Sequence, residues 1–165
     1  MIELVRWKKE YGELFYLQSN SVELYRNLSD SFPKTLEECR NIVEWFAGSS
    51  DEKECARAIL LDGKMIGSIA VFFENDIYQK NAEIAYWIGK EYWGRGIITE
   101  VLKEFTQFVF SRYDIERIYA RPFAYNKGSQ RALEKSGFLQ EGILKRSVFK
   151  DGQINDACIY AITKD

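Results

Sequence analysis

Apolar positions recur along this chain with two different periods. Strict alternation of apolar and polar residues is typical of a half-buried strand, and apolar residues three and four positions apart are typical of a helix. Strands are predicted over residues 2–7, 55–62, 65–73, 82–88, 117–123, 138–149 and 155–162. Helices are predicted over residues 36–47, 97–113 and 126–136, with residues 9–29 helical in pieces. This succession of strands and helices predicts an α/β domain.

Turn and capping signals support several of these boundaries. Thr35 is followed three residues later by Glu38, which is the capping-box pattern of a helix start. Asp-Gly pairs at positions 62–63 and 151–152 predict tight hairpin turns. Between the hairpins, the helix over residues 97–113 joins two strands, which predicts a right-handed crossover. We therefore expect antiparallel strands at both ends of the domain and one central strand–helix–strand unit.

The composition fits one globular domain that covers residues 1–165. With 46% hydrophobic residues, the chain can bury a core. The formal net charge of −2 provides no broad basic surface for nucleic acid. No apolar run approaches the roughly 18 residues of a membrane span. We therefore expect neither nucleic acid nor a membrane as a partner.

The histidine and cysteine content limits the kinds of catalytic and metal site that the chain can form. Histidine is absent, which excludes a Ser-His-Asp triad, a Cys-His dyad and the histidine-containing zinc sites, so no metal is expected. The three cysteines, Cys39, Cys55 and Cys158, are widely spaced and form no CxxC pair. Free thiols in a reducing compartment are their expected state, which predicts a cytoplasmic protein.

A glycine-rich segment joins a predicted strand to a predicted helix. Residues 93–98 read Trp-Gly-Arg-Gly-Ile-Ile. Gly94 and Gly96 allow the backbone to approach a ligand closely, because glycine has no Cβ. The first amides of the helix lack partners within it and lie at the positive end of its dipole. A loop that only turns the chain is the alternative, but the two flanking elements favour a site for a phosphate-bearing small molecule.

A second segment, residues 126–138, opens another predicted helix. Asn126 is the expected N-cap, and Leu133 is expected to pack inward. Asn126 and Ser129 lie one helical turn apart on the same face. The first turn of this helix is therefore both a structural cap and a candidate ligand contact.

Together the two segments resemble the acetyl-CoA-binding motif and the following motif of the GNAT superfamily of N-acetyltransferases. The branch most similar to them contains the ribosomal-protein N-terminal acetyltransferases (RimJ/RimL-like). The order and spacing of elements match from about residue 2 to about residue 163. The resemblance implies a mixed, mostly antiparallel sheet of roughly six to seven strands flanked by helices. That sheet would be splayed where acetyl-CoA binds, between the strands over residues 82–88 and 117–123.

The resemblance also implies a binding mode for acetyl-CoA as a co-substrate. The pantetheine arm would hydrogen-bond along Trp87 and Ile88 like an added strand. The pyrophosphate would bind main-chain amides of residues 94–99, and the thioester would lie near Asn126 and Ser129. The implied cofactor-binding residues are Trp87, Ile88, Gly94, Arg95, Gly96, Ile98, Thr99, Asn126 and Ser129.

Three positions depart from the family pattern. Trp93 stands where the phosphate loop usually begins with Gln or Arg, and Ile98 stands where Gly or Ala is usual. Leu133 stands where many members have a tyrosine that protonates the leaving thiolate. A leucine cannot donate that proton, so Ser129 is the remaining candidate for the acid, as in the RimJ/RimL-like branch.

Glu83 is the candidate catalytic base. It matches a strand glutamate that serves as base in several family members, and a carboxylate can take the proton of an acceptor amine directly or through water. The alternative for Glu83 is a solvated glutamate at a strand end. Glu141 and the pair Glu74 and Asp76 are other candidates, either as base or as groups that orient a cationic acceptor.

The implied activity is direct transfer of an acetyl group from acetyl-CoA to a primary amine in a ternary complex. A protein N-terminus, a polyamine, an aminoglycoside-like molecule and another small amine remain possible acceptors, and a homodimer is open. One rival is a non-catalytic acyl-CoA-binding module. The other is a dinucleotide-binding domain, which is disfavoured because Thr99 replaces the third glycine of its fingerprint and because hairpins flank the central unit.

Overall fold

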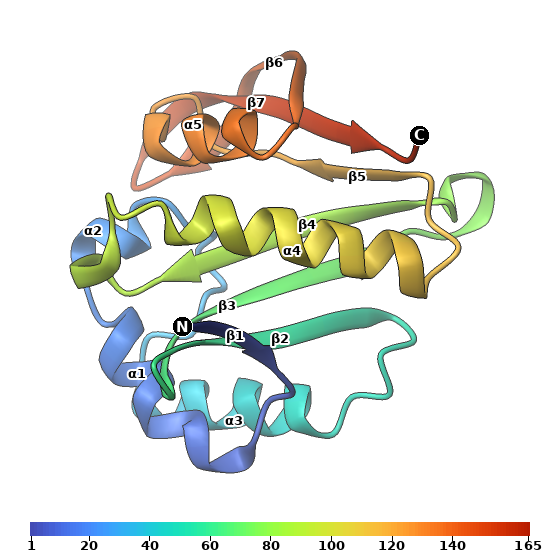
Figure 1. The fold of residues 1–165 in the computed structure, drawn as a ribbon. Coiled ribbons are helices and arrows are strands. Elements are labelled where there is room, and N and C mark those ends of the chain that lie inside the picture. The colour runs from blue at the N-terminus through green and yellow to red at the C-terminus, as the bar shows by residue number, and fades with distance from the viewer. The chain divides into compact units, whose positions relative to one another are not determined.

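The computed structural model of the protein describes residues 1–165 and contains seven strands and five α-helices. The strands are β1 Ile2–Val5, β2 Glu54–Leu61, β3 Lys64–Phe73, β4 Asn81–Ile88, β5 Arg117–Ala120, β6 Leu139–Lys150 and β7 Gln153–Thr163 (Figure 1). The α-helices are α1 Gly12–Ser19, α2 Val22–Tyr25, α3 Leu36–Ala47, α4 Ile97–Arg112 and α5 Lys127–Lys135. Short 3₁₀ helices are η1 Lys9–Tyr11, η2 Asp76–Tyr78 and η3 Lys90–Tyr92.

The strands hydrogen-bond in the order β1-β2-β3-β4-β5-β7-β6. Strands β4 and β5, which are connected through α4, pair in parallel. The pairs β1–β2, β2–β3, β5–β7 and β6–β7 are antiparallel. The expected mixed, mostly antiparallel sheet is therefore confirmed. None of the helices has the length and the apolar character needed to cross a membrane.

Two strands end two or three residues earlier than the sequence predicts. The first strand ends at Val5 instead of Trp7, and the Trp7 side chain packs into the core with 4% of its surface exposed. Strand β5 ends at Ala120, three residues before the expected end at Phe123. Pro122 has no N–H to donate to a ladder. Beyond it, Phe123 forms an isolated bridge with Ala157.

The chain forms two compact units. Unit 1 comprises Met1–Phe72 and Ala85–Ile97, and unit 2 comprises Phe73–Ile84 and Ile98–Asp165. The division runs through β4 and directly after the first residue of α4. That residues 1–165 act as a single domain stays a prediction.

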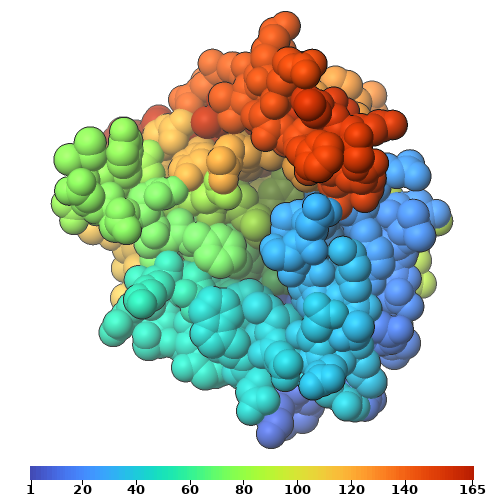
Figure 2. Space-filling model, turned by 180° about the vertical axis from the view of Figure 1, so that it is seen from behind, coloured from blue at the N-terminus to red at the C-terminus, as the bar shows by residue number.

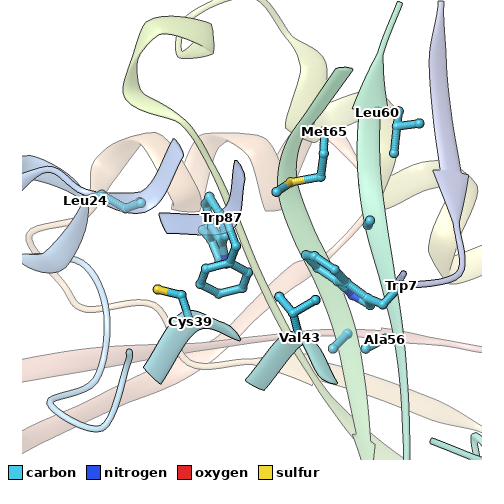
Figure 3. Packing of buried hydrophobic residues seen from close by; sticks show 11 residues of the cluster. Trp7, Leu24, Cys39, Val43, Ala56, Leu60, Met65 and Trp87 are labelled. Atoms are coloured by element: carbon cyan, nitrogen blue, oxygen red, sulfur yellow. The ribbon is translucent and has the colours of Figure 1, made fainter. Parts of the chain in front are cut away.

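The core of unit 1 is rich in aromatic and sulfur-containing side chains (Figure 3). Trp87 meets the Phe15 ring edge to face, with centroids 4.8 Å apart. Trp7 lies 5.7 Å from Phe15 by the same measure. Aromatic pairs at such distances add roughly 0.5–1.5 kcal/mol beyond the burial of their area. The core therefore fixes the end of β4 through the buried Trp87 ring.

Unit 2 has its own core, supplied largely by α4. Helical spacing predicts an apolar stripe of five residues on this helix, of which Val101, Leu102, Phe105 and Val109 are fully buried and Ile98 is half-buried. On the last strand, the buried Tyr160 donates its hydroxyl to a carboxylate oxygen of Glu134 at 2.8 Å. Burial, the Glu134 hydrogen bond and nearby negative groups raise the pKa of Tyr160 to about 12, so this hydroxyl remains protonated at neutral pH.

The predicted capping box at the start of α3 is present. Thr35 Oγ1 accepts a hydrogen bond from the Glu38 amide at 3.1 Å, and Glu38 Oε1 accepts one from the Thr35 amide at 3.2 Å. We expect Thr35→Ala to lower the free energy of unfolding by about 1 kcal/mol, because the Glu38 amide loses its partner. Urea denaturation measures this, and Thr35→Ser, which keeps the hydroxyl, is the control. Equal losses in both variants would show that the cap is not the cause.

Candidate active site

The glycine-rich loop that precedes α4 contains two residues in the left-handed region. The φ angles are +76° at Gly94 and +75° at Gly96. A Cβ built on either glycine meets no atom within 4 Å. The backbone conformation, not crowding, therefore favours glycine at both positions. The space beside the loop is open, and α4 starts at the next residue, Ile97, with amides that lack helical partners.

A hydrogen bond from the Trp93 side chain connects this loop to the end of β4. The Trp93 indole Nε1–H donates to the Ile88 carbonyl oxygen at 3.0 Å. On the neighbouring strand, a Cβ on Gly67 would lie 2.2 Å from the Trp87 carbonyl oxygen, so the backbones of β3 and β4 approach too closely for any other residue. Trp93 therefore has a structural role. Its hydrogen bond connects β4, where the pantetheine arm is expected to bind, to the glycine-rich loop, where the pyrophosphate is expected to bind.

The Arg95 side chain is held within the loop region of unit 1. Its guanidinium donates to the Glu91 carbonyl oxygen at 3.0 Å and lies 5.5 Å from the centroid of the Tyr92 ring. Both contacts are to η3, directly before the loop. These contacts fix the side chain of a predicted cofactor-binding residue beside the two glycines.

Unit 2 contains the remaining predicted cofactor-binding residues. Ile98 and Thr99 are half-buried on the first turn of α4, and the Thr99 carbonyl oxygen accepts a hydrogen bond from Ser136 Oγ at 3.2 Å. Asn126 Oδ1 accepts the Ser129 amide at 3.2 Å, as expected for the N-cap of α5. The structure therefore brings Asn126 and Ser129 together and links the start of α4 to the end of α5.

Glu83 is a paired carboxylate. Its Oε1 accepts a hydrogen bond from Arg121 Nη2 at 3.0 Å, and its Oε2 lies 2.7 Å from Arg121 Nε. The second contact is an ion pair without hydrogen-bond geometry, and Oε2 is buried. The Glu83 hydrogen bond is the main cause of a raised pKa of Arg121. The alternative of a freely solvated Glu83 does not fit these contacts, and its role as base stays a prediction.

Sequence reasoning missed Arg121, and the register of the sheet explains why. In the parallel pair of β4 and β5, Glu83 lies opposite Tyr119 and Asn81 lies opposite Arg117. Alternate residues of a strand share a face. Arg121 follows Tyr119 by two positions, so an alternating pattern continued past β5 would have placed it on the Glu83 side. That signal has meaning only once the pairing of β4 with β5 is known.

The same part of unit 2 contains an open cavity of about 620 Å³, which is within the size range of small-molecule sites. In Figure 2 the green atoms of the segment around η2 and the orange to red atoms of the C-terminal segment lie on two sides of a hollow on this face. The lining residues are Glu74, Tyr78, Asn81, Arg117, Tyr119, Arg121, Leu144 and Ile159. Of these, only Glu74 was a candidate from the sequence. Because Arg121 also pairs with Glu83, the cavity adjoins the candidate base.

Comparison with known proteins shows similarity over most of the chain. The profile of a family described as acetyltransferase (GNAT) domain matches residues 2–139. The uncharacterized N-acetyltransferase YoaA of Bacillus subtilis (strain 168) is 32% identical over 134 residues, which are 79% of this chain and 75% of that protein. The ribosomal-protein-serine acetyltransferase of Escherichia coli (strain K12) is 28% identical over 103 residues, covering 62% of this chain and 57% of that protein.

A solved structure has the same fold. The structure of RimL, a ribosomal L7/L12 alpha-N-protein acetyltransferase in complex with coenzyme A, superposes with a TM-score of 0.87. The two sequences are 21% identical, and the match covers 98% of this chain and 93% of that one.

Proposed function

The chain belongs to the GNAT acetyltransferase family. From this premise we propose that it lies in the RimJ/RimL-like branch and acetylates a primary amine by direct attack on acetyl-CoA. As a family member it is an acetyl-CoA-dependent N-acetyltransferase. The observation that carries the proposal is the family match over residues 2–139, since this range includes Glu83, the glycine-rich loop, Asn126 and Ser129. A non-catalytic module and a dinucleotide-binding domain are not favoured.

Acetyl-CoA is proposed to bind through main-chain donors. The amides of residues 94–99 hydrogen-bond to the pyrophosphate, where the positive end of the α4 dipole favours negative charge. The left-handed φ angles and the open space at Gly94 and Gly96 support this role. The pantetheine arm pairs with Trp87 and Ile88. A carbonyl oxygen has two lone pairs, so Ile88 can accept from the ligand while it accepts from Trp93.

In the proposed reaction the amine nitrogen bonds to the thioester carbon, and the carbon–sulfur bond breaks. An alkyl ammonium has a pKa near 10 and must first lose a proton, which Glu83 takes directly or through a water. A backbone N–H at Trp87–Ile88 would stabilise the oxyanion by about 3 kcal/mol. The bonded nitrogen then loses its second proton, and the leaving thiolate receives one from Ser129 or from a water that Ser129 holds, so that the proton released by the nitrogen restores the donor.

The names of related proteins suggest the first acceptor to test. The ribosomal-protein-serine acetyltransferase and RimL are both named for protein acceptors. A protein N-terminus is therefore our leading candidate, with a polyamine and an aminoglycoside-like molecule as alternatives. We also propose a homodimer, which sedimentation analysis tests. The free cysteines Cys39, Cys55 and Cys158 support a reducing, cytoplasmic location.

The test of this function is an acceptor screen that detects release of the coenzyme A thiol. Peptides, polyamines and aminoglycosides serve as acceptors, and calorimetry with acetyl-CoA and with NADH tests the donor. We expect acetyl-CoA to bind, NADH not to bind, and at least one amine to release thiol. Acetyl-CoA binding with no thiol release from any amine would favour a binding module instead.

Replacement of Ser129 is expected to have a modest effect. A serine hydroxyl is a weak acid, and much of the rate comes from holding amine and thioester together. We expect Ser129→Ala to lower kcat by less than about tenfold, which is below the effect usual for a strong general acid. The Ser129 amide keeps its hydrogen bond to Asn126, so α5 remains capped. A loss of 100-fold or more would give Ser129 a larger share in proton transfer.

A further inference from the structure

The cavity of unit 2 is bounded on one side by a hydrogen-bonded turn. The Glu74 amide donates to the Asn81 carbonyl oxygen at 3.0 Å, which closes the turn between β3 and β4. The Asn81 side chain then donates to the Tyr78 carbonyl oxygen at 3.2 Å. Because these bonds fix residues 74–81, Glu74, Tyr78 and Asn81 are presented to the cavity by one ordered segment.

Most polar groups of the cavity already satisfy one another. Arg117 donates to Asn81 Oδ1 at 3.2 Å and forms an ion pair with Glu141. Arg121 is paired with Glu83. Each guanidinium therefore has its own carboxylate partner, which offsets its charge.

Glu74 differs from the other two carboxylates, because its partner is neutral. The Tyr119 hydroxyl donates to Glu74 Oε1. Burial is the largest cause of a pKa of Tyr119 far above its ordinary value, and the Glu74 hydrogen bond adds to it. Tyr119 therefore remains protonated and holds the Glu74 carboxylate without cancelling its charge. Three carboxylates and two guanidiniums leave this group one net negative charge, at Glu74.

The rest of the wall is apolar or aromatic. Leu144 and Ile159 line the cavity from β6 and β7, and the rings of Tyr78 and Tyr119 line it from the turn and from β5. The Tyr119 ring also has the Arg117 guanidinium 5.1 Å from its centroid, which fixes the ring further. The cavity therefore presents one carboxylate without a cationic partner, and its other lining groups are apolar or already paired. Such a lining suits a ligand with one positive charge on an otherwise apolar molecule.

We propose that this cavity is the acceptor site, and that it selects a single ammonium group carried next to an apolar or aromatic group, with Glu74 as the residue that binds the ammonium. This inference rests on the proposed acetyltransferase function. Two sources have this chemistry, a free apolar monoamine and a protein N-terminus whose first side chain is apolar. Polyamines and aminoglycosides do not fit, because their further ammonium and hydroxyl groups would meet apolar side chains or already paired ones.

The first test compares two acidic residues of the same turn. Glu74→Gln keeps the shape of the side chain and the hydrogen bond from Tyr119 but removes the charge. We expect it to raise the KM for the amine by about tenfold or more, with the KM for acetyl-CoA unchanged. Asp76→Asn removes a charge two residues away that does not line the cavity, and asparagine tolerates the positive φ of 54° there. An unchanged amine KM in Glu74→Gln, or an equal rise in Asp76→Asn, would overturn the inference.

The second test uses an acceptor panel to identify the source. The panel contains 2-phenylethylamine, 3-methylbutylamine, peptides that begin with Leu or Ser, spermidine and kanamycin. We expect kcat/KM to be highest for the two monoamines or for the Leu peptide, and whichever is higher identifies the source. Higher values for spermidine, kanamycin or the Ser peptide would overturn the proposed selectivity while leaving the acetyltransferase function intact.

A binding measurement separates this inference from the proposed function. Calorimetry with 2-phenylethylamine and with 2-phenylethanol, in the absence of acetyl-CoA, does not depend on turnover. We expect the amine to bind, the alcohol to bind at least about tenfold more weakly, and Glu74→Gln to remove the difference. If this pattern holds while no amine is acetylated, the proposed function fails and the cavity assignment stands. Equal binding of amine and alcohol would overturn the assignment.

Discussion

Replacing Gly96 with aspartate is expected to weaken acetyl-CoA binding by at least about 100-fold, the equivalent of losing two hydrogen bonds to a charged group. The new carboxylate would extend into the open space beside the loop, where the pyrophosphate is proposed to bind. It would repel the phosphate oxygens and also cover the amides that bind them. Calorimetric titration with acetyl-CoA measures the change.

Gly152 provides a closely matched control. Its φ angle is +76°, against +75° at Gly96, and a Cβ there also meets no atom within 4 Å. Gly152→Asp in the turn between β6 and β7 therefore introduces the same charge with the same backbone strain. We expect both variants to lose similar stability and only Gly96→Asp to lose affinity. Unchanged affinity in Gly96→Asp would place the phosphate site elsewhere.

Elements that depend on short sequence signals, such as a helix cap or the spacing of apolar residues, were predicted correctly. The bounds of α3, Leu36–Ala47, agree with the prediction, because a capping box opens the helix and Gly48 follows its last residue. The apolar stripe of α4 follows from helical spacing alone, and four of its five positions are fully buried. The loop before β4 was expected, but its conformation was not predicted, because Asp76 adopts a left-handed conformation that its sequence does not demand. Likewise, β5 stopped early where Pro122 interrupts the ladder.

Some residues of the candidate site can be identified from short sequence motifs, and others only from the pairing of distant strands. Gly94, Gly96, Asn126 and Ser129 lie in short motifs, so a linear sequence is enough to select them. The partner of Glu83 could not be selected, because Arg121 is 38 residues away and reaches it only through the register of β4 and β5. Register depends on packing across the whole sheet and cannot be deduced from the sequence of either strand alone.

Replacing Glu83 with glutamine is expected to lower kcat by about 100-fold and to move the pH dependence of the rate to higher pH. Glutamine preserves the shape of the side chain but cannot accept a proton. Turnover would then depend on the fraction of acceptor that is already unprotonated, and this fraction rises until the pH reaches an ammonium pKa near 10. Thiol release measured from neutral to alkaline pH at saturating substrates gives the profile.

Glu141→Gln is the control that separates proton transfer from the loss of an ion pair. Glu141 is paired with Arg117 on β5 as Glu83 is paired with Arg121, and both carboxylates are partly exposed. If Glu83 is the base, Glu141→Gln changes kcat by less than about threefold, as expected for a partly exposed pair, and keeps the wild-type pH profile. If both variants lose the same activity and share one profile, the charge balance around the two arginines explains the loss. A base other than Glu83, or water alone, would then have to take the proton of the amine.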